Sequence, residues 1–143
     1  MRTLLIPIDG SKARMRSAVA EAIAICSREP AAVHLLSVQP GLSSHVAMFF
    51  GNGELHQIQH AAGMEDLAPA QALLDAAGVP HTASVMVGRS AETIARAARS
   101  LGCDRIVMGP ESNGGFAGKM FGSLAGQVRQ IVGGAPDCQV IGS

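Results

Sequence analysis

The chain has 143 residues with 11 Lys and Arg, 11 Asp and Glu and a formal net charge of zero, and 48% of its residues are apolar. This composition excludes a disordered chain, and the length predicts a single domain over residues 1–143. Because Trp and Tyr are absent and no basic block occurs, a nucleic-acid interface and a polybasic membrane anchor are both excluded.

The start of the chain and the cysteines indicate a cellular compartment. Pro7 and Asp9 interrupt the first apolar run, so this segment is typical of a strand and not of a signal peptide. No apolar run approaches the length of a membrane-spanning helix. Cys26, Cys103 and Cys138 are widely spaced and form no C-x-x-C pair, which disfavours zinc and thioredoxin-type chemistry. We therefore expect buried thiols in a reducing environment and a cytoplasmic protein.

The first two strands are predicted from compact apolar runs. Residues 4–8 are followed at once by Asp9, a helix-start signal, and residues 33–38 form the second run. Apolar residues recur at helical spacing over residues 15–26, between the two strands. Since Pro7 has no backbone N–H, one side of the first strand must lack a partner there or carry a bulge.

The middle of the chain carries the weakest pattern. Residues 41–60 are expected to form a mobile loop that leads into a helix, and Pro69 must either begin or kink that helix. Three histidines of this region have no acidic partner at a known metal-site spacing, which favours solvated side chains over metal ligands. They are His45, His56 and His60.

The second half continues the alternation of strands and helices. Residues 83–87 and 105–108 are predicted strands, and the helix between them has Ser90 as its expected N-cap. A helix over residues 124–132 and a short strand over 139–141 follow. The order predicts a Rossmann-like α/β fold: an open, doubly wound, mostly parallel five-stranded sheet with helices on both faces.

Residues 108–123, MGPESNGGFAGKMFGS, join the fourth strand to the last helix. Glycine lets the backbone approach a ligand closely, and a helix N-terminus offers unpaired N–H groups and partial positive charge. Ligands of open parallel sheets bind beyond the carboxyl ends of the strands. The segment therefore predicts phosphate binding at this edge, although an ordinary strand-to-helix loop is the simpler alternative.

The chain resembles the universal stress protein family over essentially its whole length. The matching segments are residues 5–11, 34–38, 87–88, 104–109 and 122–123. The family's ATP-binding branch has Gly, two residues, Gly, nine residues, Gly, then Ser or Thr in the loop. Gly109, Gly122 and Ser123 fit this pattern, whereas Ser112 stands at the second glycine position. Its Cβ keeps the backbone away from a phosphate, while its hydroxyl is able to donate to one.

The resemblance implies an adenine nucleotide ligand, ATP with Mg²⁺ or a related nucleotide. Asp9 corresponds to the acidic residue near the adenosine or the metal, with an N-cap role as the alternative. The backbone of Val38 would read the adenine edge, and Ser123 would contact phosphate. The implied ligand-binding residues are Pro7, Asp9, Val38, Gly109, Ser112, Gly122 and Ser123, with Asp9 also the metal ligand.

The resemblance predicts a stress-response protein that uses the nucleotide as a switch toward an unidentified protein partner. No nucleophile–base pair is evident, so we expect a binder and not an enzyme, with slow ATP hydrolysis at most. The alternative is a nucleotide-free dimeric interaction module on the same fold, in which Ser112 disrupts the phosphate site. The family usually dimerises through its last strand, and Val140 and Ile141 lie on the predicted edge, which implies a homodimer.

Overall fold

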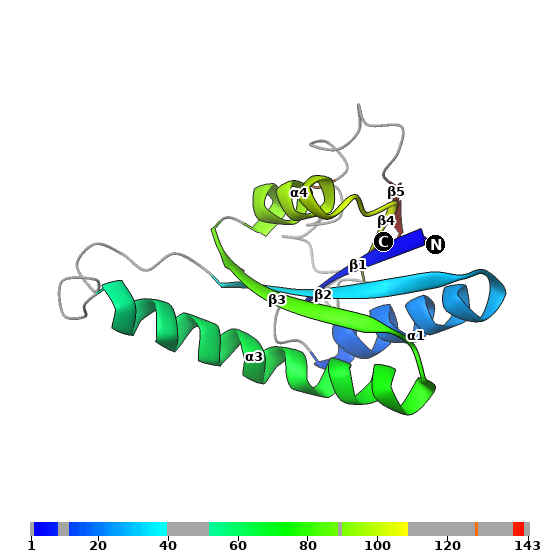
Figure 1. The fold of residues 1–143 in the computed structure, drawn as a ribbon, viewed down its shortest axis with the longest axis horizontal. Helices are drawn as coiled ribbons and strands as arrows, with labels where there is room; N and C mark the ends of the chain where they lie inside the picture. Colours follow the sequence, from blue (N-terminus) through cyan, green and yellow to red (C-terminus); the bar gives the residue numbers. More distant parts are fainter. Residues whose placement is uncertain are drawn as a thin grey trace, which may run out of the picture.

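A computed structural model describes most of the chain as alternating strands and helices (Figure 1). The described residues are 2–8, 12–39, 52–88, 90–108, 128 and 139–141. The elements are β1 (Arg2–Ile8), α1 (Lys12–Arg28), β2 (Ala31–Gln39), α3 (Asn52–Ala77), β3 (His81–Val87), α4 (Ser90–Leu101), β4 (Arg105–Val107) and β5 (Gln139–Ile141).

All the strands belong to one parallel sheet in the order β3-β2-β1-β4-β5. β2 pairs with β1 along the whole of β1 and with β3 along the whole of β3. From β1 the chain builds outward through β2 and β3, and then crosses to the other side of β1 for β4 and β5. The predicted α/β fold with a parallel sheet is confirmed.

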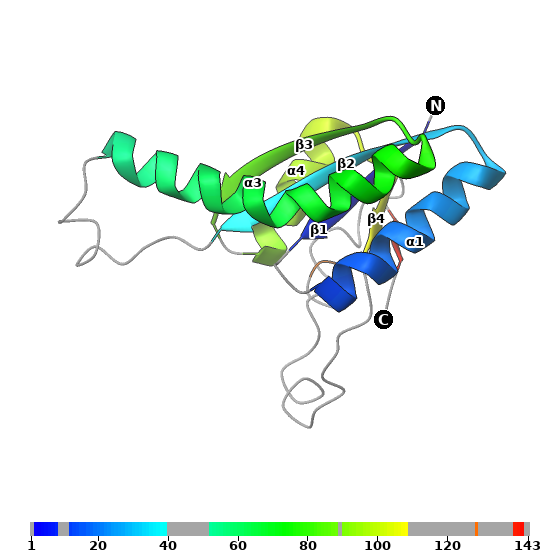
Figure 2. The same cartoon turned by 90° about the horizontal axis from the view of Figure 1, so that it is seen from below.

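The helices α1 and α3 cover one face of the sheet, where they lie side by side (Figure 2). The apolar stripe of α1 comprises Met15, Ala18, Val19, Ala22 and Ile25. On α3 the buried apolar side chains among residues 57–77 are Leu67, Ala70 and Leu74. Both stripes repeat every three or four positions, as an amphipathic helix on a core requires.

The helix α4 covers the opposite face of the sheet (Figure 1). Ile94 and Ala98 of α4 pack in one cluster with Leu5, Leu36 and Ile106 from three strands. Val128 is helical and fully buried in the same cluster, and it is the described residue of the predicted helix 124–132; the rest of that helix lies outside the described residues.

The long helix α3 corrects one expectation from the sequence and excludes one of two alternatives for Pro69. It begins at Asn52, so the second part of the expected loop 41–60 is helical, whereas residues 40–51 lie outside the described part of the chain. Pro69 lies inside α3 and does not begin it. No helix among the described residues has the length and apolar character needed to cross a membrane.

Candidate functional site

The sheet has a topological switch point between β1 and β4. These strands are neighbours, yet β2 and β3 separate them along the chain. The described register between them consists of Leu4↔Arg105 and Leu5↔Ile106. In open α/β sheets, ligands bind outside the carboxyl ends of the strands at such a point. The fold therefore selects the edge that the glycine-rich segment also indicated.

Pro7 lies on the side of β1 that faces this switch point. Thr3 uses its carbonyl group toward β4, where it accepts a hydrogen bond from the Asp104 N–H at 2.9 Å. Backbone groups of alternate residues in a strand face opposite neighbours, so Pro7 faces the same side as Thr3. No described residue of β4 pairs with Pro7, while Leu36 of β2 pairs with it on the other side. The prediction that one side of the strand lacks a partner at Pro7 is confirmed for the described residues.

The backbone of Val38 faces β1 near the end of that strand. The N–H of Val33 donates to the Pro80 carbonyl at 3.1 Å, so odd-numbered residues of β2 face β3. Val38 therefore faces β1, one position beyond the last described register pair, Ile8↔Ser37. Its side chain packs against the buried cluster between the sheet and α4. This placement agrees with a backbone role for Val38, because the side chain is committed to the core.

Polar groups gather at the end of β2 on the opposite face. The Gln39 side-chain amide donates to the Ser37 hydroxyl at 3.0 Å and to the Asp66 carboxylate of α3 at 3.4 Å. The carbonyl of Gln39 accepts a hydrogen bond from the Gly88 N–H at 3.0 Å. These bonds fix the carboxyl ends of β2 and β3 relative to α3. The sequence pattern did not single out Ser37 or Gln39 as site residues, because Ser and Gln are common at strand ends.

The other predicted site residues lie outside the described part of the chain. Asp9 follows Ile8, the last residue of β1, by one position. Gly109 follows Met108, which is buried directly after β4. Ser112, Gly122 and Ser123 belong to the same undescribed stretch.

Few of the side chains considered as metal ligands belong to the described residues. Among the described residues, no group of three or more His, Cys, Asp or Glu side chains is placed to hold a metal ion. His60 is exposed on α3, whereas His45 and the side chain of His56 are outside the description. The expected ligand Asp9 is likewise outside it.

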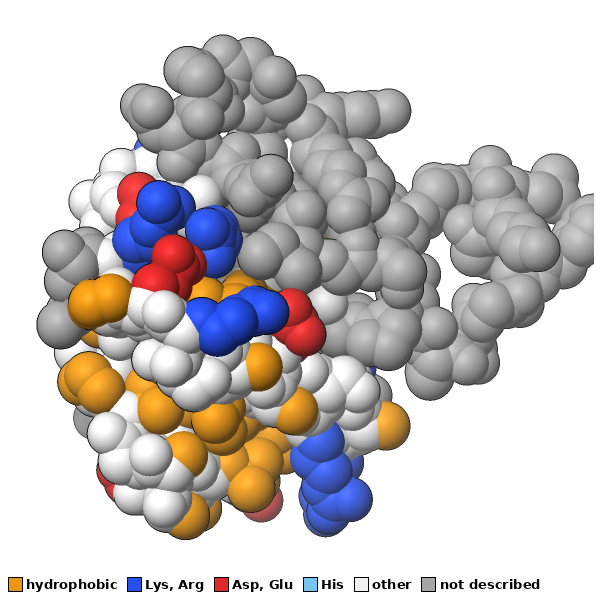
Figure 3. Space-filling model, turned by 90° about the vertical axis from the view of Figure 1, so that its right-hand side faces the viewer, with side chains coloured by type: hydrophobic (Ala, Val, Ile, Leu, Met, Phe, Trp, Pro, Cys, Tyr) orange, Lys and Arg blue, Asp and Glu red, His pale blue; other side chains and the backbone are white. Residues whose placement is uncertain are grey.

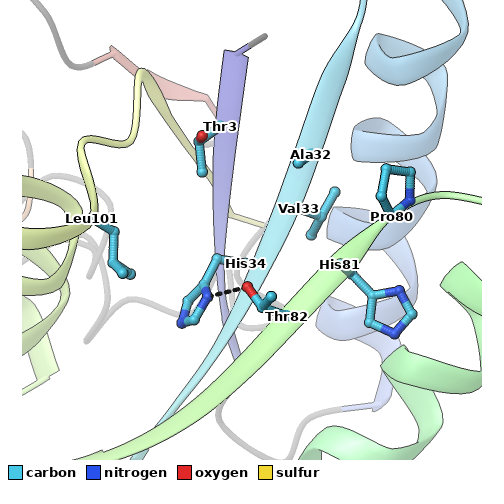
Figure 4. A pocket seen from close by; sticks show the side chains of 8 residues that line it. All are labelled: Thr3, Ala32, Val33, His34, Pro80, His81, Thr82 and Leu101. Carbon is cyan, nitrogen blue, oxygen red and sulfur yellow. Dashed lines mark hydrogen bonds between the residues drawn. The ribbon is translucent and has the colours of Figure 1, made fainter.

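A cavity opens at the opposite, amino edge of the sheet (Figure 4). Its volume is about 350 Å³, and its lining includes Thr3, His34, Thr82 and the half-exposed Leu101. Nδ1 of His34 lies 2.6 Å from the Thr82 hydroxyl, and Nε2 lies 2.8 Å from the Ser84 hydroxyl. Both ring nitrogens are thus already engaged, and this histidine has a structural role between β2 and β3.

The charge pattern of this amino edge gives no single-sign surface. Figure 3 faces this end of the molecule and shows acidic and basic side chains next to one another, with hydrophobic side chains below them. Nη1 of Arg105 lies 2.7 Å from Oε1 of Glu29, and Nε of Arg2 lies 3.6 Å from Oε2 of the same carboxylate. The described side chains of this edge therefore form no basic patch for a phosphate.

The described cysteines are structural. Cys103 is buried, and the thiol of the half-buried Cys26 lies 3.7 Å from the Ala31 carbonyl. Burial, and then the nearby Glu29 carboxylate, raises the pKa of the Cys26 thiol. A raised pKa keeps the group as the weakly nucleophilic thiol. Cys26 therefore fits the predicted small apolar role.

Comparison with known proteins identifies a family and a set of related folds. The model of the Universal stress protein family matches residues 1–132. The structure of the universal stress protein UspA from Lactobacillus plantarum is 26% identical, with a TM-score of 0.68 over 99% of this chain and 96% of that chain. No curated protein matches the chain significantly.

Two further similar structures contain nucleotides. One is a universal stress protein in complex with cAMP, 17% identical with a TM-score of 0.69, which covers 99% of this chain and 95% of that chain. The other is the universal stress protein from Archaeoglobus fulgidus in complex with dAMP, 15% identical with a TM-score of 0.67, which covers 99% of this chain and 97% of that chain. At these identities the likeness concerns the fold.

Proposed function

Because the chain belongs to the universal stress protein family, we propose that it binds an adenine nucleotide at the carboxyl edge of its sheet as a switch in a cytoplasmic stress response. The observation that carries the proposal is topological. Asp9 and the segment 109–123 directly follow the two strands that flank the switch point. The cAMP and dAMP complexes of two relatives add support, since both ligands contain adenine.

The proposal assigns the base and sugar to the ends of β1 and β2. The Val38 backbone would read the adenine edge, and Pro7 would line the side of β1 that β4 leaves unpaired. Asp9 would contact the sugar or hold Mg²⁺, because carboxylate oxygens are the protein ligands that Mg²⁺ prefers. When bound, the metal would neutralise phosphate charge.

The phosphates would lie on the glycine-rich segment. Gly109 and Gly122 allow close approach of the backbone, and Ser123 would donate a hydrogen bond at the start of the last helix. Contacts made only in the bound state would change the surface that this segment offers to a protein partner. ATP is the first candidate ligand, and Ser112 decides how tightly it is held.

Isothermal titration with Mg-ATP, ADP, AMP and cAMP tests this assignment. Gly122→Val places a β-branched side chain against the phosphates, and we expect it to weaken binding by at least about tenfold. Ala76→Val on the exposed side of α3 introduces the same side chain away from the proposed site and is the control. Equal affinities of Gly122→Val and wild type would refute the phosphate site.

The second candidate is a nucleotide-free dimeric interaction module, and Ser112 is the feature that favours it. If Ser112→Gly creates ATP binding that the wild type lacks, this candidate replaces the first. A homodimer through the last strand belongs to both candidates, and the position of β5 at one edge of the sheet supports it. Substituting Val140 by Lys tests that edge by sedimentation.

A further inference from the structure

The strand β3 forms the second edge of the sheet, remote from β5. It pairs with β2 on one side, and no described strand pairs with its other side. The carbonyl of Pro80 and the N–H of Gly88 both bond to β2, at 3.1 Å and 3.0 Å. By alternation, the even-numbered residues of β3 face β2 and the odd-numbered residues face outward. The outward backbone groups belong to His81, Ala83, Val85 and Val87.

Contacts on both faces hold this edge in a regular conformation. On one face, His34, which is only 8% exposed, forms hydrogen bonds with the hydroxyls of Thr82 (Figure 4) and Ser84, and these bonds fix β3 to β2. On the other face, α3 approaches so closely that a Cβ atom on Gly63 would lie 2.5 Å from a methyl group of Val85. The register with β2 runs through all of β3 without interruption. The edge is thus a regular template without a bulge toward β2.

The sequence of β3, HTASVMV, contains none of the usual devices that protect an edge. It has no Lys, Arg, Asp, Glu or Pro, and its last residue, Val87, is an apolar side chain that is 41% exposed. Natural edge strands are blunted by charges, prolines, bulges or short length. A seven-residue strand without them is suited to pairing with another strand.

We propose that β3 is a self-association edge, at which two copies of this chain pair antiparallel around a two-fold axis at Ser84. This register brings His81 opposite Val87 and Ala83 opposite Val85. It is the symmetric register that uses all four outward-facing residues in hydrogen-bonded pairs. Because the strand has no Lys, Arg, Asp or Glu, no like charges meet across the two-fold axis, and the same strand surface is able to pair with itself.

Cysteine cross-linking tests the register directly. Ser84→Cys places two thiols opposite each other in a non-hydrogen-bonded pair, where Cα atoms are about 4.5 Å apart, within disulfide range. Thr82→Cys is the matched control, because it faces Met86 of the other copy and also removes one hydroxyl from His34. In a glutathione redox buffer, we expect at least about tenfold more covalent dimer from Ser84→Cys than from Thr82→Cys or wild type. Equal yields, or no dimer from either variant, would overturn the proposal.

Sedimentation of a second pair of variants tests the hydrogen bonds. Ala83→Pro removes an outward N–H that does not belong to the ladder with β2, whereas Ala83→Ser keeps it. Both variants also carry Val140→Lys, so that the homodimer proposed through β5 does not contribute to the sedimentation. In this background we expect Ala83→Pro to weaken self-association at least about tenfold and Ala83→Ser to leave it unchanged. A dimer that survives in folded Ala83→Pro would overturn the proposal, and so would a Val140→Lys protein that stays monomeric. If Ala83→Pro does not fold, the cross-linking decides.

Discussion

The hydroxyl oxygen of Thr93 occupies the space beside Gly88, so that a Cβ atom on Gly88 would lie 2.6 Å from it. Gly88 has a φ of +151°, which side chains rarely adopt, and its N–H is bonded to the Gln39 carbonyl at 3.0 Å. Two independent requirements thus select glycine at the junction between β3 and α4. This junction also fixes the end of β2, where the Val38 backbone is proposed to meet the base.

Gly88→Ala is therefore expected to lower the free energy of unfolding by about 2 kcal/mol, since it adds backbone strain and a steric conflict. Urea denaturation of Gly88→Ala, Thr93→Ala and the double variant separates the cost of backbone strain from the cost of the steric conflict. Removing the Thr93 hydroxyl relieves the conflict but not the strain, so the double variant should be less destabilised than the sum of the single changes. Strict additivity would show that the two residues do not conflict.

The buried Thr93 hydroxyl itself lowers the free energy of unfolding. The residue is 1% exposed, and its oxygen has no hydrogen-bond partner in the described structure. Burying an unpaired hydroxyl costs on the order of 1–3 kcal/mol. Thr93→Val keeps the shape and removes this cost, so its free energy of unfolding should rise by about 1 kcal/mol. Thr93→Ser, which keeps the hydroxyl and loses the methyl group, is the control. A Thr93→Val protein less stable than wild type would reveal a hidden partner of the hydroxyl.

A pH-dependent loss of stability is expected from His34. Burial lowers the pKa of this imidazole in the folded protein, whereas the unfolded chain keeps a pKa near about 6.5. As the pH falls below that value, the unfolded state binds more protons than the folded state, and the free energy of unfolding falls. The loss ends once the pH is below the folded-state pKa.

Denaturation of wild type and His34→Gln at about pH 7.5 and about pH 5.5 measures this contribution. The other histidines are present in both proteins, so they cancel in the comparison. We expect the wild type to lose more stability than the variant over this interval. Equal losses would show that the folded protein accommodates the charged imidazole as readily as water does.

The architecture was predictable because the apolar patterns are strong and local. Compact runs such as residues 33–38 gave strands, and the stripe from Met15 gave the helix α1, which the structure confirms. Alternation of the two element types then implied the parallel sheet. Pro7 even indicated an unpaired side of β1, because a missing N–H has only a few tolerable places in a sheet.

The features that escaped prediction depend on tertiary contacts. The helix α3 begins at Asn52, in a stretch whose glycines and histidines gave no helical pattern, and of the two alternatives for Pro69 only the helix start is excluded. The bonds of His34 to Thr82 and Ser84 join residues that are far apart in the sequence. For the site, the sequence pointed to the carboxyl edge of the sheet, and the strand order added a switch point at that edge. The contacts of Asp9 and the segment 109–123 with a nucleotide stay a prediction.

The most direct test of the central claim is the nucleotide content of the purified protein. The protein would be purified without added nucleotide and denatured, and the released small molecules would be identified by chromatography and mass spectrometry. The proposal predicts an adenine nucleotide in near-stoichiometric amount, lost from Gly122→Val but retained by Ala76→Val. An empty protein whose melting temperature is also unchanged by Mg-ATP would contradict the proposal and favour the nucleotide-free interaction module.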